Sequence, residues 1–145
     1  MKYLLLVLVV LLPGYRAYAQ SKIFTTNGVA IGGYDPVAYF LNAAPVKGNP
    51  AFSWVWSEAT WHFQSAENRE LFMKNPGQYT PQFGGFCAYG VSRNYKVKSE
   101  PDAWSIVDDK LYLNYNTEVQ KKWLADKETY IKRAGANWTT LENTR

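Results

Sequence analysis

Two side chains in this sequence of 145 residues stand out for chemistry: Cys87, the only cysteine, and His62, the only histidine. A thiolate is both a nucleophile and a soft metal ligand, and imidazole is a common metal ligand and proton carrier. Three interpretations of Cys87 therefore stay open: inert core packing, thiol redox chemistry, and ligation of copper or zinc with His62 as a second ligand. The sequence does not decide whether the protein is an enzyme.

The surroundings of Cys87, in the run PQFGGFCAYG, support more than one of these interpretations. Gly84 and Gly85 allow close backbone approach and can expose amide N–H groups, which would depress the thiol pKa and make Cys87 a candidate catalytic nucleophile. Phe86 and Tyr89 are core-like neighbours and favour packing instead. Because the chain has no second cysteine, a redox cycle would need an external thiol or another partner.

His62 is the weaker signal. It alternates with Trp61 and Phe63 in a β-prone run, so His62 faces outward if those two aromatic residues face the core. A metal site would need Cys87 and His62 together with a carboxylate, a methionine or water, and no ligand spacing in the sequence points to such a site.

Cap and turn signals predict the elements that position these residues. Asp35-Pro36 begins a short helix, DPVAYFLN, and Ser65 caps a second helix that ends near Lys74. The remaining expected elements are a hairpin of 52–56 with 60–63, a helix or turn at 84–92, a hairpin of 104–107 with 110–115, and a helix at 118–136 with a kink near Asp126. The order predicts an α+β fold, with a small antiparallel sheet of β-hairpins packed with short helices and a longer C-terminal helix.

The first 19 residues have the features of an export signal. Lys2 precedes the apolar run LLLVLVVLLP, and Ala17-Tyr18-Ala19 is a small-x-small cleavage pattern. We therefore expect a periplasmic or extracellular protein made of a signal peptide at 1–19, an N-terminal extension at 20–32, a domain at 33–138 and a tail at 139–145. The extension and the tail are polar and are expected to be loose ends.

Charge and hydropathy exclude two classes of partner. Removal of residues 1–19 takes Lys2 and Arg16 away and lowers the formal net charge from +4 to about +2. The remaining basic residues are scattered among acids, so we expect no nucleic-acid binding. No later segment approaches the roughly 20 apolar residues of a membrane helix, so the chain is not expected to be membrane-embedded after signal cleavage. The many tryptophans and tyrosines are expected to pack in the core.

Three motifs in order carry a family resemblance: GGYDPVAYF, then WHFQSAENRELFMKNPGQYTPQFGGFCAYGV, then KLYLNYN followed by a terminal NW. With these motifs, residues 33–138 resemble the exported branch of the YHS-domain family. Some members of that branch carry selenocysteine at the position of Cys87, so the resemblance implies a reactive chalcogen there and a role in metal binding or thiol redox chemistry. The alternative is a noncatalytic interaction domain with Cys87 in the core.

The better-known YHS modules bind metal through cysteines in a DPVCG start and a YFCSxxC stretch. This chain keeps the other positions of that pattern, which are Asp35, Pro36, Val37, Phe63, Ser65, Phe72, Pro76 and Tyr79. The cysteine positions hold Ala38, Gln64 and Asn68, so the soft ligands for copper or zinc are missing. The family's metal site is therefore not carried over to these residues, and a metal-handling partner is implied only through Cys87.

Overall fold

The computed structural model describes residues 22–144, and the signal peptide expected at 1–19 lies outside them. The N-terminal half holds β1 (Thr25–Thr26), β2 (Val29–Ala30), the 3₁₀ turn η1 (Ile31–Gly33), α1 (Ala38–Leu41), β3 (Asn49–Trp56), β4 (Ala59–Phe63), α2 (Ala66–Lys74) and α3 (Pro76–Tyr79). The C-terminal half holds η2 (Gln82–Gly85), α4 (Ala88–Ser92), β5 (Glu100–Val107), β6 (Lys110–Asn114), α5 (Thr117–Ala125) and α6 (Lys127–Leu141). The α+β class predicted from the sequence is confirmed.

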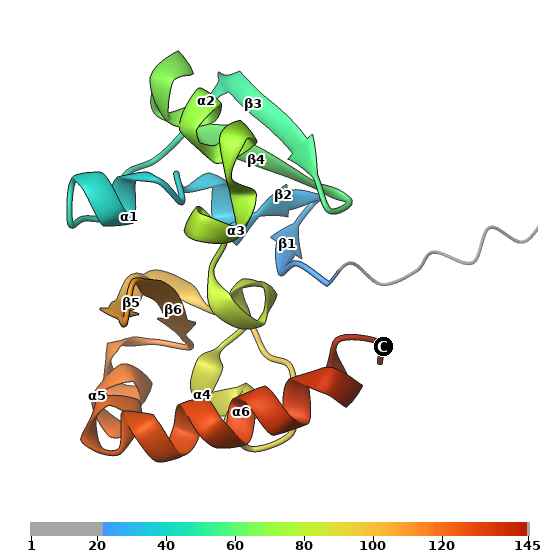
Figure 1. Ribbon diagram of the computed structural model, residues 1–145, viewed down its shortest axis with the longest axis vertical. Coiled ribbons are helices and arrows are strands. Elements are labelled where there is room, and N and C mark those ends of the chain that lie inside the picture. Colours follow the sequence, from blue (N-terminus) through green and yellow to red (C-terminus); the bar gives the residue numbers. More distant parts are fainter. Residues whose placement is uncertain (1–21, 145) are drawn as a thin grey trace, which may run out of the picture.

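The strands form two sheets, where the sequence predicted one small antiparallel sheet. The four-stranded sheet has the order β1-β2-β4-β3, and β5 pairs only with β6. The pairing of β2 with β4 is parallel, with Val29 opposite Thr60, so the larger sheet is mixed. Figure 1 shows this sheet with α1–α3 in one half of the molecule and the β5-β6 hairpin with α4–α6 in the other.

Both predicted hairpins are present, and their turns have the same geometry. Ser57 and Glu58 join β3 to β4 with φ angles of 50° and 61°, and Asp108 and Asp109 join β5 to β6 with φ angles of 50° and 58°. Two successive left-handed residues make the type I′ turn, whose twist matches that of the paired strands. The acidic pair at 108–109 is thus the turn of a hairpin.

The predicted start of α2 at Ser65 is confirmed by its capping bond, whereas the helix expected from Asp35-Pro36 begins only at Ala38, and its N-cap residue Val37 supplies no side-chain bond. Asp35 Oδ1 accepts the backbone N–H of Val37 at 2.8 Å, and Ser65 Oγ accepts that of Asn68 at 3.1 Å. The long C-terminal helix differs from the expected kinked one, because the extended φ of −148° at Asp126 divides it into α5 and α6.

The expectation of loose ends is wrong for the described residues. Ile23 and Ile31 are buried, and Phe24 donates its N–H to the carbonyl of Gly84 at 2.8 Å. The start of the expected tail continues α6, where Leu141 is buried. Apolar side chains within otherwise polar segments fix both ends to the body of the domain.

A shared core joins the two halves. Its largest cluster packs Trp61 and Phe63 of β4 and Phe72 of α2 against Leu111 and Leu113 of β6. Most of the aromatic residues contribute to this and two smaller clusters, as expected. Within residues 22–144, no helix is both long enough and apolar enough to cross a membrane.

Candidate functional site

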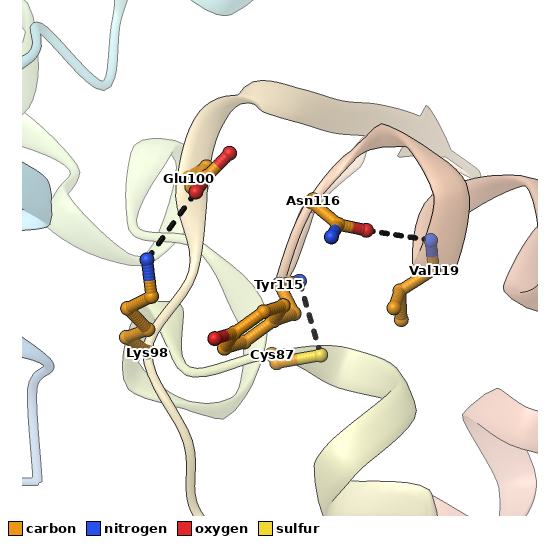
Figure 2. A network of polar contacts seen from close by, with 6 residues as sticks. All are labelled: Cys87, Lys98, Glu100, Tyr115, Asn116 and Val119. Atoms are coloured by element: carbon orange, nitrogen blue, oxygen red, sulfur yellow. Dashed lines mark hydrogen bonds and ion pairs between the residues drawn. The ribbon is translucent and has the colours of Figure 1, made fainter.

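The Cys87 sulfur lies where the start of α4 meets the end of β6. It accepts the backbone N–H of Tyr115 at 3.2 Å, as Figure 2 shows, and that of Gly90 at 3.4 Å. The first donor comes from a segment 28 residues further along the chain. The sulfur is therefore held from two sides, by the end of the β5-β6 hairpin and by the short helix α4.

Asn114 is the side chain that completes this arrangement. It is fully buried at the end of β6, and its Oδ1 accepts the N–H of Tyr89 at 3.0 Å and the S–H of Cys87 at 3.6 Å. Its Nδ2 is buried and has no hydrogen-bond partner among residues 22–144. Because the N–H of Tyr89 can donate only to the amide oxygen, Oδ1 of Asn114 must be the atom that faces the sulfur. The atom left unpaired is therefore the donor Nδ2.

Burial and hydrogen bonding act in opposite directions on the thiol. Cys87 is only 1% exposed, and burial raises the pKa of its thiol, while the N–H groups of Gly90, Tyr115 and Tyr89 oppose that rise. The net direction is upward, so the expected depressed pKa is wrong. The N–H donors would stabilise a thiolate once one forms.

Gly84 and Gly85 do not supply these donors. Gly84 has a φ of 62°, and a Cβ there would lie 1.8 Å from the carbonyl oxygen of Lys22. A Cβ on Gly85, whose φ is 83°, would lie 2.7 Å from Ile31. The two glycines let the N-terminal segment lie against η2, which is a structural role.

A pocket of about 240 Å³ opens beside the thiol. Its wall contains Cys87 and five other residues: Tyr89, Tyr95, Val97, Tyr115 and Val119. Tyr95 and Tyr115 are exposed, so the pocket is open to solvent on their side. Lys98 lies over the ring of Tyr115, with Nζ 4.9 Å from the ring centroid, and pairs with Glu100 at 3.3 Å (Figure 2). The sulfur is thus shielded from bulk water yet borders a small space lined by three tyrosines and two valines.

His62 lies elsewhere. It points away from the core between the buried Trp61 and Phe63, as the alternation predicted, and it lines a different pocket with Lys47. Burial and the charge of Lys47 lower the pKa of its imidazole. The lining residues of the two pockets do not overlap.

The predicted metal pairing of Cys87 with His62 is therefore not supported by the geometry. In the part of the chain that the structure describes, no group of three or more His, Cys, Asp or Glu side chains is placed to hold a metal ion. Cys87 directly precedes α4 and His62 lies in β4, and these two elements belong to different halves of the fold.

Ala38, Gln64 and Asn68 meet around one carboxylate. Asp35 is fully buried, and its Oδ2 accepts the backbone N–H of Gln64 at 2.9 Å and the side-chain Nδ2 of Asn68 at 2.7 Å. Its Oδ1 accepts the N–H of Ala38 at 3.4 Å besides that of Val37. A hydrogen-bonded carboxylate thus occupies the centre of these positions and ties α1 and α2 to the end of β4.

Sequence reasoning found Cys87 and missed Asn114 and Tyr115. One signal was available for Asn114, since it is a polar residue at the end of the apolar run KLYLN, where a buried amide needs partners. Tyr115 contributes its backbone N–H, a group that nearly every residue has, so its residue type could not predict this contact. Asn137 has a structural role, because its Nδ2 donates to the carbonyls of Val91 and Ser92 at 2.9 and 3.2 Å.

Comparison with known proteins finds no matching family model, no matching curated protein and no matching solved structure.

Proposed function

We propose that this protein is an exported domain of the YHS type whose functional site is the Cys87 pocket, and that the site carries out thiol redox chemistry. The family part of the proposal rests on the ordered motifs and on the meeting of Ala38, Gln64 and Asn68 around Asp35. Export to the periplasm or the extracellular space rests on the leader-like residues 1–19.

One observation carries the redox part. The sulfur of Cys87 accepts hydrogen bonds from two backbone N–H groups and borders a pocket of about 240 Å³. Donors aimed at sulfur stabilise negative charge on it, and the pocket lets a small reactant reach it while larger ones stay outside. Ligation of one metal by Cys87 and His62 is not part of this proposal, because the two residues line separate pockets.

The chemistry is a two-electron oxidation. The Cys87 thiol first loses its proton to water, the thiolate attacks one oxygen of a small peroxide, an S–O bond forms as the O–O bond breaks, and the departing hydroxide takes up a proton from water. Cys87 is thereby oxidised to a sulfenic acid and the peroxide is reduced. An external thiol then condenses with the sulfenic acid to a mixed disulfide and releases water, and a second external thiol restores Cys87 and leaves as part of a disulfide.

The test uses the single cysteine as its own reporter. Native protein is treated with hydrogen peroxide in the presence of dimedone, which traps sulfenic acid, and the intact mass is followed with time. We expect the adduct to form in native protein and to be absent from Cys87→Ser. Val119→Phe, which fills part of the pocket wall, should slow the reaction, whereas Val55→Phe on the exposed face of β3 should not.

The alternative is a noncatalytic interaction domain in which Cys87 is core. The 1% exposure of Cys87 and the raised pKa of its thiol favour this second function. It predicts that the adduct forms only as fast as the protein unfolds, with Val119→Phe changing the rate only through stability. That result would remove the redox proposal and leave the interaction domain.

A further inference from the structure

A second pocket, of about 360 Å³, lies between the N-terminal strands and the segment that leads into β3. Its wall includes the β1-β2 turn at Asn27, the backbone of Gly32 and Gly33, Lys47 and His62. It shares no residue with the Cys87 pocket and takes no part in the proposed thiol chemistry.

Two nitrogen groups converge where Gly33 lacks a side chain. A Cβ on Gly33 would lie 3.2 Å from Nδ1 of His62 and 3.7 Å from Nζ of Lys47. The missing side chain therefore leaves a space that both nitrogens border. The φ of 79° at Gly33 is a left-handed conformation, which glycine adopts without strain.

The backbone on either side of Lys47 is fixed. Gly48 donates its N–H to the carbonyl of Gly33 at 2.9 Å, and Asp35 donates to the carbonyl of Val46 at 2.9 Å. Gly48 lies so close to β4 that a Cβ there would be 2.5 Å from the carbonyl carbon of His62. Lys47 and His62 are thus presented from two segments held at fixed separation.

The charge of Lys47 is not neutralised. Its Nζ donates to the carbonyl of Gly32 at 2.6 Å and lies 4.7 Å from the ring centroid of Tyr34. The ion pairs within residues 22–144 involve Lys22, Lys98 and Lys127, and the wall of this pocket contains no Asp or Glu. Burial first, and the charge of Lys47 second, lower the pKa of the His62 imidazole.

We propose that this pocket binds a small molecule through an oxyanion group, a carboxylate or a phosphate, held by Nζ of Lys47 and the imidazole of His62. A cation with only neutral partners gains a charge-assisted hydrogen bond when such a group enters. The space exceeds that of a bare ion and falls in the range of small-ligand pockets, and Val29 and Pro50 supply apolar wall for the rest of the molecule.

The test follows the ring signals of His62, the only histidine, in the proton NMR spectrum of the untagged protein. Inorganic phosphate and acetate are titrated separately at fixed near-neutral pH and constant ionic strength, with chloride as the balancing anion. We expect a saturable shift with phosphate, acetate or both, and the comparison of the two identifies the anionic group. Amide signals of Gly33 and Gly48 provide a second reporter.

Variants separate a site from a general charge effect. Lys47→Gln should weaken binding by about tenfold or more, the loss expected for one charge-assisted hydrogen bond. His62→Gln, read through the amide signals, should weaken it as well. Lys110→Gln, which removes an exposed cation at the start of β6, should leave binding unchanged. A shift that does not saturate, or one that is equal in wild type and Lys47→Gln, would overturn the proposal.

Discussion

The side-chain nitrogen of Asn68 donates a hydrogen bond of 2.7 Å to the carboxylate of Asp35, and both residues are buried. The bond joins α2 to the segment before α1, across 33 residues of sequence. The buried carboxylate of Asp35 is held by hydrogen bonds alone among the described residues, so the arrangement depends on every donor being present.

Asn68→Ala tests that dependence. Removal of the amide leaves one lone pair of a buried carboxylate without its donor, so we expect a loss of about 1.5–3 kcal/mol in the free energy of unfolding. Urea denaturation followed by tryptophan fluorescence measures it. Gln64→Ala is the matched control, because it removes an exposed bond to Asn42 and keeps the backbone N–H that Asp35 accepts. Equal losses in the two variants would contradict a special role for the buried bond.

The N-terminal segment provides a second test, since its described part belongs to the fold. Ile23→Ala removes most of a side chain that is 5% exposed and should cost about 2–5 kcal/mol in the free energy of unfolding. Val55→Ala, at a position that is 68% exposed, should change it little. Thermal and urea unfolding of both variants give the comparison. A loose extension would make Ile23→Ala as mild as Val55→Ala.

Local signals account for the elements that could be predicted from the sequence. Ser65 bonds the N–H of the residue three positions on, and the turns at 57–58 and 108–109 join strands that are adjacent in sequence. The β1-β2 hairpin carried a signal of the same kind, because Asn27-Gly28 is a preferred type I′ pair, but its strands have only two residues each. Runs that short have no periodicity to detect.

Long-range contacts could not be predicted in the same way. The parallel pairing of Val29 with Thr60 and the bond from Tyr115 to Cys87 each join distant segments. The type of Cys87 identified it as a candidate, yet its pKa depends on burial and on donors from elsewhere in the chain. The space between Lys47 and His62 likewise exists only because Gly33 has no side chain to fill it.

The hairpin turns predict a stabilising substitution. Glu58 holds a φ of 61°, which costs a non-glycine residue roughly 1–2 kcal/mol, and glycine avoids most of that cost while it loses more chain entropy on folding. Glu58→Gly should therefore raise the free energy of unfolding by about 0.5–1 kcal/mol. Glu67→Gly, at an exposed position in the first turn of α2, should lower it. A loss of stability in both variants would argue against the left-handed turn.

Alkaline pH should weaken the fold through Cys87. The pKa of its thiol is raised in the folded state, so the unfolded chain gives up this proton first as the pH rises above the ordinary value of about 8.5. Stability from this group is complete below that pH and is lost as the pH rises toward the folded pKa.

Burial also raises the pKa of Tyr112, which acts in the same direction, so the difference between wild type and Cys87→Ser isolates the thiol. Urea unfolding across alkaline pH, under reducing conditions, should show a steeper fall for wild type than for Cys87→Ser. Parallel pH profiles would mean that the thiol titrates alike in the folded and unfolded chains.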